Sequence, residues 1–144
     1  MHTAILSAGV NNLSGSLPKE ITHLTNLRQL LLDSNYISGS LPNEIGSMKS
    51  LETIILHTCS LTGKIPESLY YLSSLTVLYL NMNDLEGTIS TNVGNLQKLS
   101  QLALSDNPSL NGALPSELGL CMDLTYLHIS NTGKSALVCF MCDV

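Results

Sequence analysis

The chain has 144 residues, of which 44% are hydrophobic and only 4% are aromatic, and its formal net charge is −5 at pH 7. The Lys and Arg residues are scattered singly, so no basic stripe is present to neutralise the phosphates of a nucleic acid. No run of about 18 apolar residues is available to cross a bilayer, so we expect no transmembrane segment in this chain.

Apolar residues recur with a period of 24 along most of the chain. A unit this short has one apolar side and cannot bury it alone, so successive units must stack into one continuous core. The sequence therefore predicts a solenoid over residues 1–132, followed by an apolar tail at 133–144. The expected repeats are residues 3–26, 27–50, 51–74, 75–98, 99–123 and a partial repeat at 124–132.

Each repeat opens with a segment of the form LxxLxL. The second and third leucines, such as Leu30 and Leu32, are two residues apart and point the same way from an extended strand, so we expect them in the core. A short polar residue then ends the strand, where its side chain can satisfy the turning backbone of its own and adjacent coils. This predicted asparagine ladder comprises Asn11, Asn35, Cys59, Asn83 and Asn107, with Cys59 expected to be structural rather than reactive.

The return half of each repeat has its own markers. Glycines mark a turn that leaves no room for a Cβ atom, and prolines three residues later fix φ and oppose a helix upstream. Ser90 replaces the proline in one repeat, which predicts a looser turn there, and one extra residue at Pro108 or Ser109 predicts a small bulge. Two apolar columns are expected on this side: Ile21, Ile45, Leu69, Val93 and Leu118, and Leu24, Met48, Leu72, Leu96 and Cys121.

Together these residues resemble the plant-type leucine-rich repeat, whose pattern is approximately LxxLxLxxNxLSGxIPxxLGxL. The resemblance implies an α/β-type repeat solenoid, a right-handed coil with a parallel β-sheet on its concave side and 3₁₀ or irregular turns on its convex side. It also implies recognition of a protein or peptide rather than catalysis, with no cofactor.

Strand alternation predicts where a partner would bind. If Leu30 and Leu32 point inward, their neighbours point outward onto the exposed face of the sheet, which we call the concave sheet face. The middle column there reads Ser7, Leu31, Ile55, Tyr79, Ala103 and His128. An apolar centre with a polar rim is typical of an interface, although strand propensity alone could select the apolar residues. The candidate binding residues are Gln29, Leu31, Asp33, Thr53, Ile55, His57, Val77, Tyr79, Asn81 and Gln101, with Ser105 on the same rim.

Other motifs give weaker signals. Gly133-Lys134-Ser135 lacks the first glycine of a phosphate-binding loop. Cys139 and Cys142 form a CxxC that could be a disulfide, half a zinc site or a redox pair, but no second CxxC completes a metal site. We therefore expect no metal site, and no catalytic residues, because His57 and His128 lack a suitably placed cysteine or serine. Asn12-Leu13-Ser14 is a glycosylation sequon, usable if the chain is secreted.

The ends of the chain bear on its context. Residues 1–10 have neither the basic nor the apolar region of a signal peptide, so we expect none in this sequence. The cysteine-containing N-terminal cap usual in plant-type ectodomains is also not seen. Solenoids need capped ends, so we expect partial exposure of Leu6, Leu13, Leu17 and Ile21. The tail residues Ala136, Leu137, Val138, Phe140 and Met141 could form a lid over the last coil.

Two functional classes remain open. In the first, the chain is the recognition module of a receptor-like or secreted protein, and it binds a protein or peptide on the concave sheet face. In the second, it is a structural or adaptor subunit of a larger multiprotein assembly that uses the uncapped solenoid ends. The location would be extracellular or at the cell surface for a fragment of a receptor-like protein, and intracellular or organellar for a complete chain.

Overall fold

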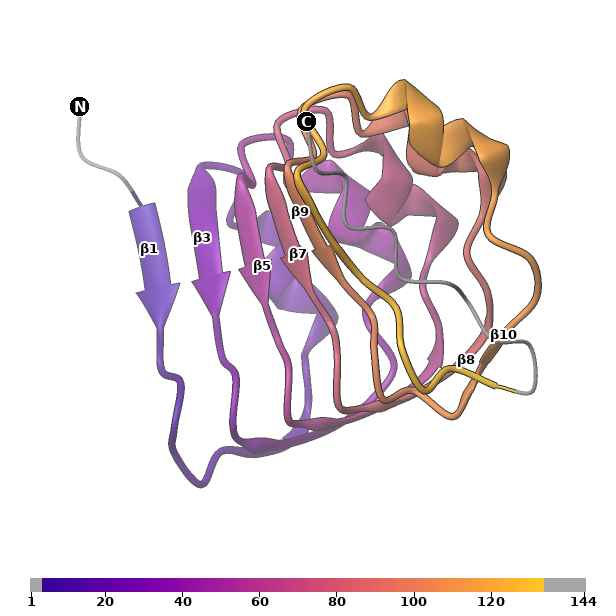
Figure 1. The fold of residues 1–144 in the computed structure, drawn as a ribbon. Coiled ribbons are helices and arrows are strands. Elements are labelled where there is room, and N and C mark those ends of the chain that lie inside the picture. The colour runs from indigo at the N-terminus through magenta and orange to yellow at the C-terminus, as the bar shows by residue number, and fades with distance from the viewer. Residues whose placement is uncertain (1–3, 134–144) are drawn as a thin grey trace.

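A computed structural model describes residues 4–133, and its coils repeat the same three parts (Figure 1). A strand from the LxxLxL segment comes first, a short second strand follows, and a 3₁₀ helix returns the chain to the next coil. The strands of the first kind stand side by side on one side of the molecule, and the 3₁₀ helices cover the opposite side (Figure 1). The predicted solenoid with its parallel sheet and 3₁₀ turns is therefore confirmed.

Within residues 4–133, the larger sheet has six parallel strands in the order β1-β3-β5-β7-β9-β11. These strands are β1 (Ala4–Ser7), β3 (Leu27–Leu31), β5 (Thr53–Ile55), β7 (Val77–Tyr79), β9 (Gln101–Ala103) and β11 (Tyr126–His128). Leu30 pairs with Ile54, and Ile54 pairs with Leu78, so residues 24 apart in sequence lie in the same row. All three side chains are buried, which confirms the predicted equivalence of the repeats.

The return side of the described coils holds a smaller parallel sheet of five strands and the 3₁₀ helices. Its strands are β2 (Ser14–Ser16), β4 (Tyr36–Gly39), β6 (Ser60–Lys64), β8 (Asp84–Thr88) and β10 (Ser109–Asn111). The helices are η1 (Lys19–His23), η2 (Asn43–Ser47), η3 (Glu67–Tyr71), η4 (Thr91–Asn95) and η5 (Ser116–Leu120). The turn glycines adopt left-handed backbone, with φ from +72° to +90°, as the sequence predicts.

One continuous core runs between the two sheets and the 3₁₀ helices. Both predicted return columns are buried in the middle coils, for example at Ile45 and Leu72. Exposure rises in the first described coil, where Leu13 is 44% exposed and Leu24 is 48% exposed. The expected uncovering of this coil is confirmed, and it extends to Leu24, which the sequence placed in a buried column. The cause is that no preceding coil packs on these residues within the described part of the chain.

Asn83 shows how the ladder joins adjacent coils. Its amide nitrogen donates to Leu80 O in its own coil, at 3.0 Å, and to Leu56 O in the preceding coil, at 2.9 Å. Its amide oxygen accepts from the Leu61 N–H at 3.0 Å. One buried side chain therefore satisfies backbone groups from two coils, as the sequence predicts.

The other ladder positions follow this geometry to different degrees. Asn35 and Asn107 make the equivalent contacts and are buried. The Cys59 thiol reaches two carbonyl oxygens only at 3.6 Å, so its bonds are weaker. Asn11 is exposed and bonds only within its own coil, so the prediction that it belongs to an internal ladder is wrong at this end.

A feature that the sequence did not reveal lies one residue before each ladder residue, and again before Thr132, the equivalent position in the last described coil. The backbone there is left-handed in every described coil, although none of these residues is glycine. These positions hold apolar, hydroxyl, acidic and amide side chains, so no single residue type in the sequence predicts the left-handed backbone. The residues are Val10, Ser34, Thr58, Met82, Asp106 and Asn131, with φ between +52° and +57°.

Two positions depart from the repeat pattern, the extra residue near Pro108 and the serine at position 90, and the structure accommodates each locally. The extra residue near Pro108, where the sequence predicts a small bulge, lies in a turn that the Leu110 N–H closes on Asn107 O at 3.0 Å. Ser90 has φ −70° and ψ 148°, close to the prolines that precede the other 3₁₀ helices, and its hydroxyl accepts from the Asn92 N–H. The prediction of a looser turn is therefore wrong, because the serine side chain caps η4.

Candidate binding surface

The concave sheet face presents the ten candidate residues in rows across β3, β5, β7 and β9 and the segments that follow them. Each residue alternates with a buried neighbour, so Leu31 lies between the buried Leu30 and Leu32 and points to the other side. All ten are half-buried: Gln29, Leu31, Asp33, Thr53, Ile55, His57, Val77, Tyr79, Asn81 and Gln101. The parallel register brings them together as one surface.

An apolar strip forms the middle of this surface. Leu31 pairs with Ile55, and Ile55 pairs with Tyr79, on strands that lie about 4.8 Å apart. Because each side chain is only partly covered by its neighbours, the three together offer a continuous apolar area that water still reaches.

The strip does not continue evenly to the last strand. Ala103, the next residue in the column, is only 3% exposed, and Ser105 on the rim is fully buried. Ala103 is paired with Tyr79 on one side and with His128 on the other, and both side chains are much larger than its methyl group. The Ser105 hydroxyl lies 3.3 Å from His128 Nδ1. The expectation that Ala103 and Ser105 are exposed on the concave sheet face is therefore wrong.

Tyr126 is a surface residue that the sequence analysis missed. Its ring centre lies 6.1 Å from that of Tyr79 and 6.2 Å from that of His128, within the range of aromatic pairing. The sequence could have predicted its place. Once the extra residue of the fifth repeat is counted, Tyr126 is the equivalent of Gln101, a member of the predicted surface, and the two residues pair in the sheet. Three rings therefore gather at this end of the concave sheet face.

Hydrogen bonding fixes Tyr79 on this surface. Its hydroxyl donates to Gln101 Oε1, which holds the ring toward β9. Burial, and next the neighbouring Tyr126, raises the pKa of Tyr79 above its ordinary value. The hydroxyl consequently keeps its proton at neutral pH and remains a donor, so Tyr79 adds a polar handle to the apolar strip.

Asp33 and His57, which follow β3 and β5, form part of the polar rim of the concave sheet face, away from the aromatic rings near β11. His57 Nε2 lies 3.8 Å from Asp33 Oδ2, an ion pair when the imidazole is protonated. His57 Nδ1 lies 3.0 Å from Thr58 Oγ1, which orients the ring. This arrangement gives the rim hydrogen-bonding capacity next to the apolar strip, the combination found at interfaces.

The cysteines that the structure describes are not activated. Burial raises the pKa of the Cys59 and Cys121 thiols, which keeps them protonated at neutral pH. Residues 4–133 contain no group of three or more His, Cys, Asp or Glu side chains arranged to hold a metal ion. Cys139, Cys142 and the predicted lid at 133–144 lie outside the described residues, apart from Gly133. No 3₁₀ helix in the described part of the chain has the length and apolar character needed to cross a membrane.

Comparisons with known proteins agree with this architecture. A family model described as a leucine-rich repeat region matches residues 5–141. Comparison with curated protein sequences gives no match. Among solved structures, the chain is similar to the plant peptide hormone receptor RGFR1 in complex with RGF2, with 39% identity and a TM-score of 0.88 over 90% of this chain and 21% of that chain.

Two further structures show the same likeness. The Arabidopsis receptor kinase HAESA, in complex with the peptide hormone IDA and the co-receptor SERK1, matches with 37% identity and a TM-score of 0.87, over 90% of this chain and 22% of that chain. The leucine-rich-repeat ectodomain of the receptor kinase SOBIR1 from Arabidopsis thaliana matches with 28% identity and a TM-score of 0.83, over 89% of this chain and 72% of that chain.

The chain thus spans about one fifth of the length of the RGFR1 and HAESA structures. The family model covers nearly all of it, and the repeat, the sheet register and the ladder agree with that match. This chain belongs to the leucine-rich-repeat family.

Proposed function

We propose that this chain is a non-enzymatic recognition module that binds a protein or peptide through its concave sheet face. The observation that carries the proposal is the in-register strip of Leu31, Ile55 and Tyr79, half-exposed and flanked by polar side chains. A soluble sheet that served only to cover a core would be expected to place polar residues in its solvent-facing centre. A partner with apolar side chains would remove this strip from water.

Similar solved structures support the proposal that the chain binds a protein or peptide. RGFR1 and HAESA are described in complex with peptide hormones, and both contain a stretch that superposes on most of this chain. Because the chain corresponds to only part of each receptor, the contact residues proposed here come from its own surface. They are the ten candidates of the concave sheet face, with Tyr126 added at the aromatic end.

A second candidate function is that of an adaptor subunit that packs through the C-terminal end of the described solenoid. Leu120 is 58% exposed and Met122 is 90% exposed. With Gln97 and Gly119 they line a hollow of about 440 Å³. This end has apolar area, but it lacks the rows of mixed apolar and polar side chains that the concave sheet face has.

A peptide selection separates the two functions. Peptides are selected from a random library against the full chain, and one synthetic peptide is titrated by calorimetry. The variant Leu31→Ser/Ile55→Ser/Tyr79→Ser is expected to bind at least about 100-fold more weakly, because central apolar contacts are worth about 2 kcal/mol each. Thermal unfolding checks that this variant is folded.

The matched control removes three exposed apolar side chains elsewhere. Tyr71, Leu120 and Met122 are all more than half exposed and lie off the concave sheet face, so Tyr71→Ser/Leu120→Ser/Met122→Ser is expected to bind like the wild type. Unchanged binding by the first variant would refute the proposed surface. Loss in the control alone would favour the adaptor function.

A further inference from the structure

The glycosylation sequon Asn12-Leu13-Ser14 stands apart from the recognition function. Among the other asparagines of the sequence, only Asn107 has Ser or Thr two residues later, and the intervening Pro108 prevents its use as a sequon. The sequence therefore contains one usable acceptor asparagine, Asn12.

Asn12 is exposed in the segment that joins β1 to β2. Within residues 4–133 its side-chain amide makes no hydrogen bond, whereas the adjacent Asn11 donates to Ala8 O and Gly9 O. The backbone around Asn12 is nevertheless anchored, because the Leu13 N–H donates to Asn35 Oδ1 at 3.0 Å. The acceptor nitrogen is thus free on a fixed backbone.

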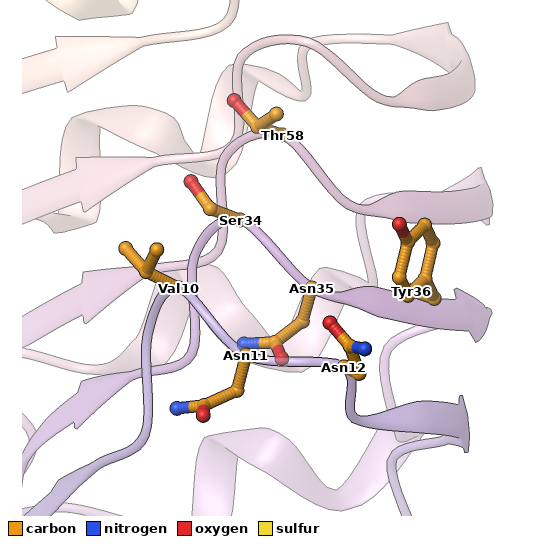
Figure 2. A pocket seen from close by; sticks show the side chains of 7 residues that line it. All are labelled: Val10, Asn11, Asn12, Ser34, Asn35, Tyr36 and Thr58. Atoms are coloured by element: carbon orange, nitrogen blue, oxygen red, sulfur yellow. The ribbon is translucent and has the colours of Figure 1, made fainter.

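A hollow of about 350 Å³ lies beside Asn12 (Figure 2). The Tyr36 ring stands next to the Asn12 side chain and is 64% exposed (Figure 2). Val10, which is 79% exposed, also lines the hollow. The lining residues are Val10, Asn11, Asn12, Ser34, Asn35, Tyr36 and Thr58.

We propose that Asn12 is an N-glycan acceptor and that the first sugar lies in this hollow against the Tyr36 ring. In the transfer, Asn12 Nδ2 forms a bond to C1 of the sugar of a lipid-linked oligosaccharide pyrophosphate. The bond from C1 to the pyrophosphate oxygen breaks, the pyrophosphate leaves with the bonding electrons, and Nδ2 loses one proton. The Ser14 hydroxyl completes the sequon that the transferase recognises.

The glycan would have a defined physical role. A pyranose ring presents an apolar C–H face, which packs on an aromatic ring, while its hydroxyls face water. The sugar would therefore cover part of the exposed Tyr36 ring with polar surface and leave the concave sheet face open. The inference rests on the proposed function and adds to it that the recognition module is part of an ectodomain, as in the SOBIR1 structure, because an ectodomain passes through the secretory pathway, where the transfer takes place.

The test uses the full chain directed into the secretory pathway of insect cells. The secreted protein is expected to carry a glycan at Asn12, shown by intact mass and by the Asn-to-Asp conversion that peptide N-glycosidase leaves. Asn12→Gln and Ser14→Ala are expected to abolish it, and the neighbouring Asn11→Gln is expected to keep it. An unmodified Asn12 in the folded, secreted chain would overturn the proposal.

A second readout tests the position of the sugar. The glycosylated chain is expected to unfold at a higher temperature than the enzymatically deglycosylated chain, and Tyr36→Ser is expected to remove that difference. A difference that survives Tyr36→Ser would overturn the packing on this ring. A glycosylated chain that selects no peptide would contradict the proposed function alone, so the two failures are distinguishable.

Discussion

Tyr70 and Ser90 depart together from the pattern of the neighbouring coils. Tyr70 occupies the position of Gly46 in the preceding coil and is only 2% exposed. Its hydroxyl accepts from the Ser90 N–H at 3.4 Å, a donor that proline, the usual residue there, does not have. Burial raises the pKa of Tyr70 to about 12, so the phenol stays neutral. The serine thus supplies the partner that a buried tyrosine needs.

This coupling predicts the effect of restoring the proline. Ser90→Pro is expected to lower the free energy of unfolding by about 1 kcal/mol, because the buried Tyr70 hydroxyl loses its donor. In a Tyr70→Phe background the same change should cost less, since no hydroxyl is left unsatisfied. Urea unfolding of the four proteins measures the coupling as a double-mutant cycle. Equal costs in both backgrounds would contradict it.

Gly46 in η2 and Gly119 in η5 occupy equivalent positions, but the space beside their Cα atoms differs. A methyl group added to Gly46 would lie 2.3 Å from Ser68 O in the next coil, whereas one added to Gly119 would meet nothing within 4 Å. Gly46→Ala is therefore expected to cost about 1–3 kcal/mol in unfolding free energy. Gly119→Ala should be neutral or stabilise by up to about 1 kcal/mol. Denaturant unfolding compares them, and equal losses would show that coil contact is not the cause.

At the scale of elements, the ladder residues hold each strand end to the coil before it. Asn35, Asn83 and Asn107 supply the donors and the acceptor that the turning backbone requires, and Cys59 supplies only weak contacts. The coil that contains β5 and β6 is therefore the least firmly connected of the middle coils at this turn. Nearest-neighbour contacts of this kind determine the stability of a solenoid.

Replacing the thiol tests this difference. Cys59→Asn is expected to raise the free energy of unfolding by about 1 kcal/mol, because the amide adds hydrogen bonds to both coils. The reverse change, Asn83→Cys, should lower it by about 1–3 kcal/mol, since it leaves the buried Leu61 N–H without its acceptor. Thermal or urea unfolding measures both. A loss of stability in Cys59→Asn would show that this turn has no room for the amide.

At the scale of the whole molecule, the structure is a stack in which burial depends on having a coil on each side. Leu30, Ile54 and Leu78 are buried in the middle of the stack, whereas Leu13 in the first described coil is exposed and Leu127 in the last is half-buried. The 24-residue period was sufficient to predict this arrangement, because each leucine contacts its equivalents in the adjacent coils.

Other features could not be predicted from the period. Burial of Ala103 depends on the sizes of Tyr79 and His128 in the neighbouring strands, which a single repeat does not specify. The left-handed residue before each ladder position is set by the shared path of the coil, and residues as different as Val10 and Asp106 adopt it. The sequence thus predicted which residues form the columns of the candidate surface. It did not predict how much the exposure of the side chains varies along each column.

The central claim is that a partner lies on the concave sheet face. The most direct measurement is the NMR spectrum of the methyl-labelled chain titrated with a selected peptide. The methyl signals of Leu31, Ile55 and Val77 are expected to shift, while those of Leu24 and Met122, at the two described ends, stay in place. Shifts confined to Leu24 or Met122, with the signals of the concave sheet face unchanged, would contradict the account.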